Sequence, residues 1–128
     1  MNIQSAYNNW SSTYDKDVNL TRDLDFDVMM KTFKNSQFDT ILEIGCGTGK
    51  NTAWLISKAK QVTAVDLSEE MLAKAKEKIK NDGVQFIQAN ITGSWTFADT
   101  KYNLITFSLV LEHIQNLDHI FNEVSKYL

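Results

Sequence analysis

The chain of 128 residues lacks proline altogether and has a single cysteine, Cys46. One cysteine excludes an intrachain disulfide, so the fold has to be stabilised by a hydrophobic core, which a chain of this length can bury unaided. With no proline, low-complexity run or internal repeat, nothing in the sequence indicates a linker between domains. Its 43% hydrophobic and 23% charged residues are typical of one globular domain.

Long apolar runs and strong basic clusters are missing as well. No segment approaches the roughly 20 apolar residues of a membrane span, and the residues after Met1 have neither the basic nor the apolar region of a signal peptide. The formal net charge is −3, and the densest basic group, which does not share one helical face, is Lys74, Lys76, Lys78 and Lys80. We therefore expect a soluble, cytoplasmic protein that binds neither membranes nor nucleic acid.

From Thr40 onward, short apolar runs alternate with helical patterns. Strands are predicted over 40–44, 61–66, 84–89 and 102–107, and helices over 20–34, over 50–59, after Ser68 and from about 117 onward. This alternation predicts an α/β fold, a Rossmann-like parallel sheet with helices on both faces and the strand order 3-2-1-4. A ligand is then expected at the carboxyl ends of the strands, at the switch between strands one and four.

Two of the predicted helices carry detailed signals. Ser68 is suited to cap the helix after the second strand, and the segment 81–83 ends that helix with Gly83 available for a left-handed cap. The apolar face predicted for the last helix consists of Leu117, Ile120, Phe121, Val124 and Leu128. Because the first residues are aromatic and acidic, we expect two parts, an N-terminal helical segment over 1–39 and the α/β domain over 40–128.

A glycine-rich loop follows the first strand, where the sequence from Glu43 to Gly49 is Glu-Ile-Gly-Cys-Gly-Thr-Gly. Glycines at such a turn let a ligand lie against bare main chain. The spacing does not fit a P-loop, because Lys50 is followed by Asn51 rather than serine or threonine. It does not fit a dinucleotide fingerprint either, since the third glycine comes one residue early. The carboxylate of Glu43 would repel a diphosphate but suits a cationic ligand.

S-adenosylmethionine is a ligand of that kind, because it carries a sulfonium and an ammonium group but no phosphate. Its ribose diol calls for a carboxylate at the end of the second strand. Asp66 stands there, 21 residues after Gly45, close to the spacing of about 20 residues for an acidic ribose ligand.

Four segments, in order, resemble the motifs of class I S-adenosylmethionine-dependent methyltransferases of the small-molecule type. They are Ile41 to Gly49, Val62 to Leu72, Phe86 to Ile91, and Tyr102 to His113. The third departs from the family at Asn90, where aspartate is usual. The resemblance spans about Tyr7 to Leu128 and implies S-adenosylmethionine as cofactor and S-adenosylhomocysteine as product.

The resemblance implies roles at the methionine and ribose end of the cofactor. Glu43 and the Gly45–Gly49 loop would hold the methionine part, with Cys46 acting through its carbonyl rather than its thiol. Asp66 would bind both ribose hydroxyls. Ser108 lies where the family offers a backbone carbonyl to the methionine amine.

At the other end of the cofactor, the resemblance implies that Leu67 packs against the adenine and that the Ile91 amide faces a ring nitrogen. The amide oxygen of Asn90 would accept from the adenine amino group, as aspartate does in the family. The complete set of expected cofactor-binding positions is Glu43, Gly45, Cys46, Gly47, Gly49, Asp66, Leu67, Met71, Asn90, Ile91 and Ser108.

Further expectations concern the acceptor. Tyr7, Trp10 and Tyr14 resemble the aromatic lid that closes over cofactor and substrate in small-molecule methyltransferases; alternatively they pack the first helix onto the sheet. His113 is the candidate general base for an acceptor that must lose a proton, and a surface histidine is the alternative. His119 is expected at the surface, and no metal is expected.

The family's full sheet has seven strands, and this sequence stops after the fourth strand and its helix. It is therefore expected to be a fragment, a truncated gene product or a stand-alone cofactor-binding half. The expected activity is methyl transfer to a small-molecule acceptor; the alternatives are a non-catalytic cofactor-binding module that needs a partner chain and an NAD-dependent oxidoreductase. The unpaired edge of the fourth strand predicts a homodimer or a partner segment there, unless the N-terminal segment covers it.

Overall fold

The structure, a computed structural model, describes residues 20–98, 100–107 and 114–128. Within these residues four parallel strands form one sheet in the order β3-β2-β1-β4, which confirms the predicted topology. The strands are β1 (Phe38–Ile44), β2 (Ala59–Asp66), β3 (Val84–Gln88) and β4 (Leu104–Phe107), and the helices are α2 (Leu20–Thr32), α3 (Lys50–Leu55), α4 (Glu69–Lys78) and α5 (Leu117–Tyr127).

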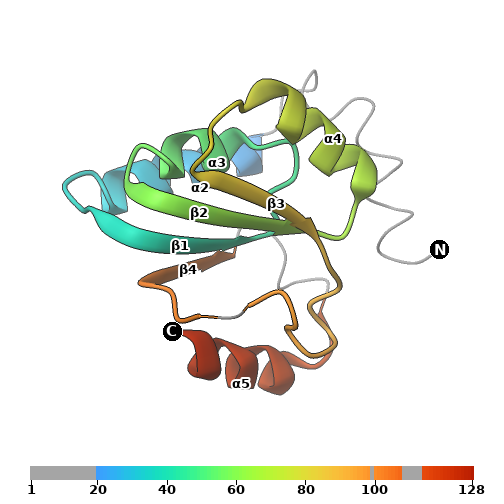
Figure 1. Cartoon of the computed structure of the whole chain (residues 1–128). Helices are drawn as coiled ribbons and strands as arrows, with labels where there is room; N and C mark the ends of the chain where they lie inside the picture. Colours follow the sequence, from blue (N-terminus) through green and yellow to red (C-terminus); the bar gives the residue numbers. More distant parts are fainter. Residues whose placement is uncertain (1–19, 99, 108–113) are drawn as a thin grey trace.

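Helices cover the sheet from both sides. Figure 1 shows α2, α3 and α4 on one side of the sheet and α5 on the other. One buried cluster lies on the α3 side and contains Ile41, Cys46, Leu55, Val62, Ala64 and Leu72. The second lies on the α5 side and contains Leu42, Ile44, Val65, Ile91, Trp95, Ala98, Tyr102 and Ile120. Successive residues of β1 alternate between the two clusters, as expected for a strand buried on both faces.

The helix α3 is shorter than predicted, because it ends at Leu55 and Ala59 already belongs to β2. The amide of Lys58 donates to the Leu55 carbonyl at 2.8 Å, which tightens the end of the helix into a turn. The carbonyl of Lys58 then accepts from the Phe38 amide at 2.7 Å. That bond draws the chain into the sheet, so β1 and β2 both begin two residues earlier than the sequence pattern predicts.

The start of α4 was predicted correctly and its end was not. Ser68 caps the helix and its hydroxyl accepts from the Met71 amide at 3.2 Å. The helix stops at Lys78, with Ile79 in an extended conformation, and Gly83 is not among the glycines with positive φ. The expected left-handed cap at Gly83 is therefore wrong. Its carbonyl instead accepts from the Val62 amide at 2.8 Å, next to β2.

Only part of the apolar face predicted for α5 is buried. Ile120 is fully buried, whereas the side chains of Leu117, Phe121 and Leu128 are 38%, 53% and 56% exposed. Glu123, a charged residue, occupies the inward position and is only 4% exposed. The helix is rotated relative to the prediction because the Glu123 carboxylate finds hydrogen-bond donors on the inner side, which apolar periodicity does not report.

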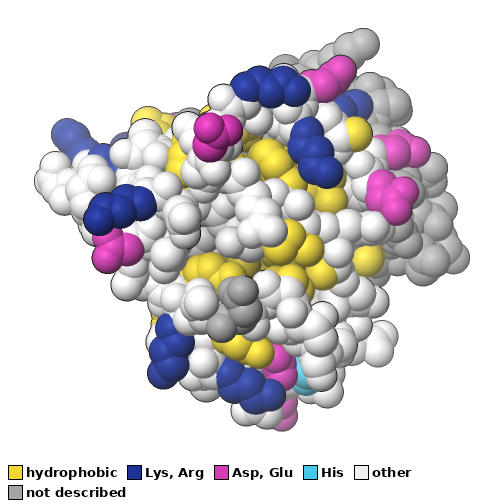
Figure 2. Space-filling view, in the orientation of Figure 1, with side chains coloured by type: hydrophobic (Ala, Val, Ile, Leu, Met, Phe, Trp, Pro, Cys, Tyr) yellow, Lys and Arg dark blue, Asp and Glu magenta, His cyan; other side chains and the backbone are white. Residues whose placement is uncertain are grey.

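The surface agrees with the modest net charge. On the face shown in Figure 2, basic and acidic side chains are interspersed rather than gathered by sign. Among the described residues, no helix has both the length and the apolar character needed to cross a membrane.

Gly83 provides a test of the packing between β2 and the turn before β3. A Cβ at Gly83 would lie 2.8 Å from the Lys60 carbonyl oxygen, whereas one at Gly93 would have no described neighbour closer than 3.9 Å. We expect Gly83→Ala to lower the free energy of unfolding by about 1–3 kcal/mol, typical of overpacking. Gly93→Ala, the matched control, should change it by less than about 0.5 kcal/mol. Urea unfolding measures both, and equal stabilities would contradict the close approach.

Candidate functional site

The carboxyl end of β1 continues into the glycine loop. Gly45, Gly47 and Gly49 have φ angles of 82°, 56° and 94°, which only glycine adopts without strain. The amides of Gly45 and Cys46 both donate to the Val65 carbonyl, at 2.8 and 3.1 Å. These bonds turn the loop toward the end of β2.

The carboxylate of Asp66 holds the loop from β2. Its Oδ2 accepts from the Gly47 amide and its Oδ1 from the Ser68 amide, both at 2.9 Å. Asp66 is only 6% exposed, and burial raises its pKa although the bonds from Ser68 and Gly47 oppose that shift. Since each carboxylate oxygen has two lone pairs, Asp66 retains acceptor capacity for a ligand hydroxyl.

Glu43 is the second carboxylate of the site and is 1% exposed. The Thr52 hydroxyl donates to its Oε1, while its Oε2 is buried without a hydrogen-bond partner among the described residues. Burial raises the pKa of Glu43 to about 7, and the negative charge of Asp66 adds to the increase. Thr106, the residue opposite Glu43 on β4, also has a buried hydroxyl without a partner there.

The loop is open at one glycine and closed at another. A Cβ at Gly47 would meet no described atom within 4 Å, so the main chain there borders free space. A Cβ at Gly49 would lie 2.7 Å from Ile79 Cδ1 and 3.3 Å from Ala75 Cβ. Gly49 is therefore required for packing against α4, whereas Gly47 leaves room for a ligand.

The expected adenine end lies after β2 and β3. The Leu67 carbonyl accepts from Gln88 Nε2 at 3.1 Å, and Ile91 is 7% exposed. The amide oxygen of Asn90 accepts from the amide and the hydroxyl of Thr92, at 3.0 and 2.6 Å. Both lone pairs of that oxygen are thus engaged within the loop, so accepting from an adenine amino group requires Asn90 to exchange a partner.

Other expected site residues have their side chains in the core. Met71 is 1% and Cys46 5% exposed, and burial raises the pKa of the Cys46 thiol, which disfavours the reactive thiolate form. The Cys46 carbonyl accepts from the Gly49 amide at 3.0 Å. Five expected positions, Tyr7, Trp10, Tyr14, Ser108 and His113, lie outside the described residues.

Thr52 and Thr106 are polar neighbours of Glu43 that sequence reasoning missed. Thr52 lies nine residues after Glu43, in α3, and Thr106 lies on another strand, so neither forms a local sequence motif with Glu43. The signal that was available is the buried Glu43, which demands a partner wherever the fold supplies one. Among the described residues, no group of three or more potential ligand side chains is arranged to hold a metal ion.

The raised pKa of Glu43 makes stability depend on pH. The pKa of about 7 lets the native carboxyl hold its proton up to about pH 7, whereas the unfolded one loses it near the ordinary pKa of 4.5. The protonated Glu43 therefore makes its full contribution to the free energy of unfolding below pH 4.5. About 3 kcal/mol of that contribution is lost as the pH rises through 7. We expect wild type to lose stability relative to Glu43→Gln between pH 5 and 8 in urea titrations. Parallel pH profiles for the two proteins would rule out a buried, proton-binding Glu43.

Comparison with known proteins places this geometry in a family. The sequence model of the protein family described as a methyltransferase domain matches residues 42–128 of this chain. Malonyl-[acyl-carrier protein] O-methyltransferase of Priestia megaterium is 30% identical over 130 residues, covering 98% of this chain and 47% of the relative.

Two solved structures extend the likeness to the fold. DhpI in its complex with SAM and HEP has a TM-score of 0.80 and 25% identity, covering 97% of this chain and 58% of DhpI. An S-adenosylmethionine-dependent methyltransferase from Clostridium acetobutylicum has a TM-score of 0.68 and 33% identity, covering 96% of this chain and 53% of that one. The chain thus spans about half the length of the proteins it matches. With its glycine loop, its sheet order and the domain match, the chain belongs to the class I S-adenosylmethionine-dependent methyltransferase family.

Proposed function

We propose that this chain binds S-adenosylmethionine over the Gly45–Gly49 loop and serves methyl transfer to a small-molecule acceptor. The observation that carries the proposal is the pair of buried carboxylates, Glu43 and Asp66, at the ends of adjacent strands beside a glycine loop that is open at Gly47. S-adenosylmethionine, the cofactor of the family, suits this arrangement because its sulfonium and ammonium groups are positively charged and the two carboxylates are acidic.

The electrostatics argue against a dinucleotide at the same place. In a phosphate-binding loop, backbone amides donate to phosphate oxygens; here the Gly47 amide already donates to the Asp66 carboxylate. A diphosphate would displace that bond and approach two buried acids. An ammonium group could instead donate the hydrogen bond that Glu43 Oε2 lacks among the described residues, and a sulfonium would offer a compensating positive charge.

The proposed binding roles are those that the family resemblance implies. Glu43 and the glycine loop hold the methionine part, and Asp66 binds the ribose hydroxyls. Leu67 and the Ile91 amide hold the adenine, with Asn90 contributing once it releases Thr92. Ser108, Met71 and Cys46 complete the proposed set, the last two by shaping the loop and the start of α4 from the core.

The reaction asks for alignment more than for proton transfer. When bound, S-adenosylmethionine supplies an activated methyl group on its sulfonium. The protein's task is to hold an acceptor in line with that methyl, which is where most of the rate enhancement of such displacements arises. A general base is needed only for an acceptor that loses a proton, and His113 is the residue proposed for that step. Tyr7, Trp10 and Tyr14 are proposed to close over the acceptor.

The proposal is tested by calorimetric titration with S-adenosylhomocysteine and NAD. We expect S-adenosylhomocysteine to bind and NAD not to bind. Asp66→Ala should weaken S-adenosylhomocysteine by roughly 10- to 100-fold, because hydrogen bonds to a charged acceptor are lost. Asp39→Ala, which removes an exposed carboxylate at the other end of β1, is the control and should bind as wild type does. Equal affinities for the two variants would remove Asp66 from the site.

A specific observation favours a second function, that of a cofactor-binding module completed by a partner. Within the described residues β4 pairs only with β1, so its other edge has no strand beside it. Helix α5 packs on the face of the sheet that includes residues of β4. It presents three exposed apolar residues, Leu117, Phe121 and Leu128. A strand edge next to an apolar helix face is a template for association.

Sedimentation at low micromolar concentration tests this second function. We expect the chain to associate, either as a homodimer or with a segment that supplies further strands, and we expect Phe121→Lys to weaken association. Val28→Lys is the control, because Val28 is an equally exposed apolar residue, at 54%, on α2. A monodisperse wild-type monomer that binds S-adenosylhomocysteine would sink the partner hypothesis and favour coverage of the edge by the residues before Thr40.

A further inference from the structure

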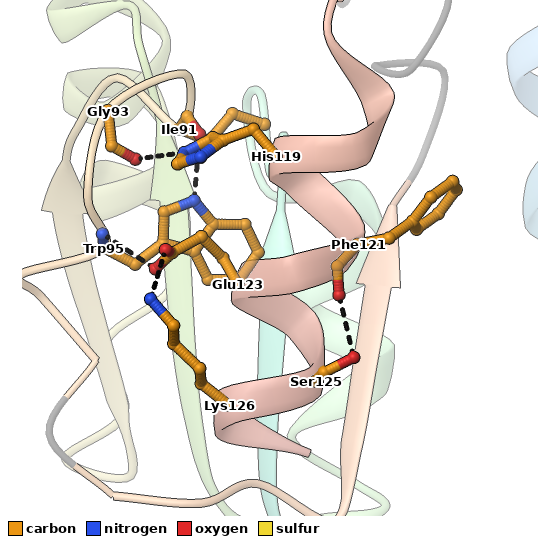
Figure 3. Close-up of polar contacts among 8 residues, drawn as sticks. All are labelled: Ile91, Gly93, Trp95, His119, Phe121, Glu123, Ser125 and Lys126. Atoms are coloured by element: carbon orange, nitrogen blue, oxygen red, sulfur yellow. Dashed lines mark hydrogen bonds and ion pairs between the residues drawn. The ribbon is translucent and has the colours of Figure 1, made fainter.

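A set of hydrogen bonds fastens the loop after β3 to helix α5 (Figure 3). We call it the α5 clasp and define it by Ile91, Gly93, Trp95, His119 and Glu123. Three of these belong to the loop and two to the helix. Figure 3 shows His119 and Glu123 on the side of α5 that faces the loop, while Phe121 points away from it. The loop begins at Asn90 and Ile91, the residues proposed to meet the adenine.

Trp95 is the centre of the clasp and is 1% exposed. Its indole Nε1–H donates to the Ile91 carbonyl at 2.9 Å, and its backbone amide donates to Glu123 Oε2 at 3.2 Å. Its ring stacks on Tyr127 of α5, with centroids 6.4 Å apart and planes inclined by 11°. One residue thus connects the Ile91 backbone to the helix through two hydrogen bonds and a ring contact.

Glu123 is an unusual residue to bury on an amphipathic helix. Its Oε1 accepts from Lys126 Nζ at 2.9 Å, and that bond is the main reason why the pKa of Glu123 is lowered. Glu123 therefore stays ionised at neutral pH and forms a charge-assisted bond with the Trp95 amide, stronger than a bond between neutral groups. An apolar residue would fill this position at lower desolvation cost, so the carboxylate indicates a need for directional contact.

His119 adds a second bond one helical turn away from Glu123. Its Nε2 lies 2.8 Å from the Gly93 carbonyl oxygen, so the ring nitrogen donates there in the tautomer that carries the proton on Nε2. Residues four apart share one face of a helix. The helix is therefore hydrogen-bonded to the loop at two points, Gly93 and Trp95. These bonds restrict the backbone conformations available to the segment that starts at Ile91.

We propose that Glu123 is a positioning residue for adenine recognition, acting through Trp95 on the Ile91 carbonyl and thereby on the turn that carries the Ile91 amide. The inference rests on the proposed function, since it assumes that the Ile91 amide faces a ring nitrogen of the cofactor. The Ile91 carbonyl lies in the peptide plane that ends at the Thr92 amide, and the Ile91 amide lies in the plane before it. Holding that carbonyl limits the ψ angle of Ile91 and so restrains the turn that carries the Ile91 amide, and a preorganised donor costs less to order when the ligand binds. Glu123 and Trp95 contact no ligand themselves; they set the direction of the group that does.

The experiment compares S-adenosylhomocysteine with S-inosylhomocysteine, in which the adenine is replaced by hypoxanthine. Hypoxanthine carries a hydrogen on N1, where adenine has an acceptor, and a carbonyl in place of the 6-amino group. An Ile91 amide aimed at N1, together with Asn90 at the amino group, therefore favours S-adenosylhomocysteine. In Glu123→Ala, affinity for S-adenosylhomocysteine should fall about tenfold, while S-inosylhomocysteine changes little and the ratio of the two affinities collapses. Trp95→Phe, which keeps the ring and deletes the indole donor, should collapse the same ratio.

Glu123→Gln keeps an acceptor for the Trp95 amide and should restore most of the ratio. Ser125→Ala is the matched control on the same helix, because the Ser125 hydroxyl donates to the Phe121 carbonyl within α5 and, in Figure 3, has no contact with the clasp. If Glu123→Ala does not fold, Trp95→Phe decides the matter. Affinities for both compounds that fall by one common factor, or a ratio that survives Trp95→Phe, would overturn the inference. A wild-type chain that binds neither compound would instead overturn the proposed function.

Discussion

Three consecutive backbone amides, those of Gly45, Cys46 and Gly47, donate to the end of β2, and the geometry of the site depends on these bonds. They turn the chain sharply after β1, which requires the left-handed backbone that glycine tolerates. The Asp66 carboxylate that receives the third amide also receives the Ser68 amide, at the cap of α4. One side chain therefore holds the loop after β1 and the helix start after β2 in fixed relation. Without the Asp66 carboxylate, the main chain that borders the open space at Gly47 would not be held in one position.

The same arrangement costs stability. Glu43 and Asp66 are both buried, both have raised pKa values, and Glu43 keeps one oxygen without a described partner. A fold selected for stability alone would place apolar side chains there, because buried acids without full compensation are destabilising. Strain or desolvation retained at one place is typical of a binding site, where the ligand supplies what the protein lacks. The cationic groups of the proposed cofactor are of the sign that relieves this cost.

How far the sequence predicts this structure depends on whether the determining contacts are local. The strands, their order, the glycine loop and the Ser68 cap follow from alternation and short motifs, and all were predicted. The end of α3, the role of Gly83 and the inward side of α5 were not, because each is decided by a partner far along the chain. Phe38 draws Lys58 into the sheet, Lys60 crowds Gly83, and Trp95 gives Glu123 a donor. For the site, the loop and Asp66 were predictable, whereas the bond of Thr52 to Glu43 and the engagement of Asn90 by Thr92 depend on side-chain geometry.

The strand order also determines when each part of the sheet can form during synthesis. β1 is made first and offers two edges; β2 pairs with one of them, β3 pairs with β2, and β4 takes the other edge of β1. Every strand after β1 therefore meets a partner that is earlier in the chain and has already left the ribosome. The glycine loop has all its described backbone partners once residue 68 has emerged. In a growing polypeptide, the proposed cofactor-binding turn is thus among the earliest tertiary features that can close, well before the clasp, whose two α5 members, His119 and Glu123, come more than fifty residues later in the chain.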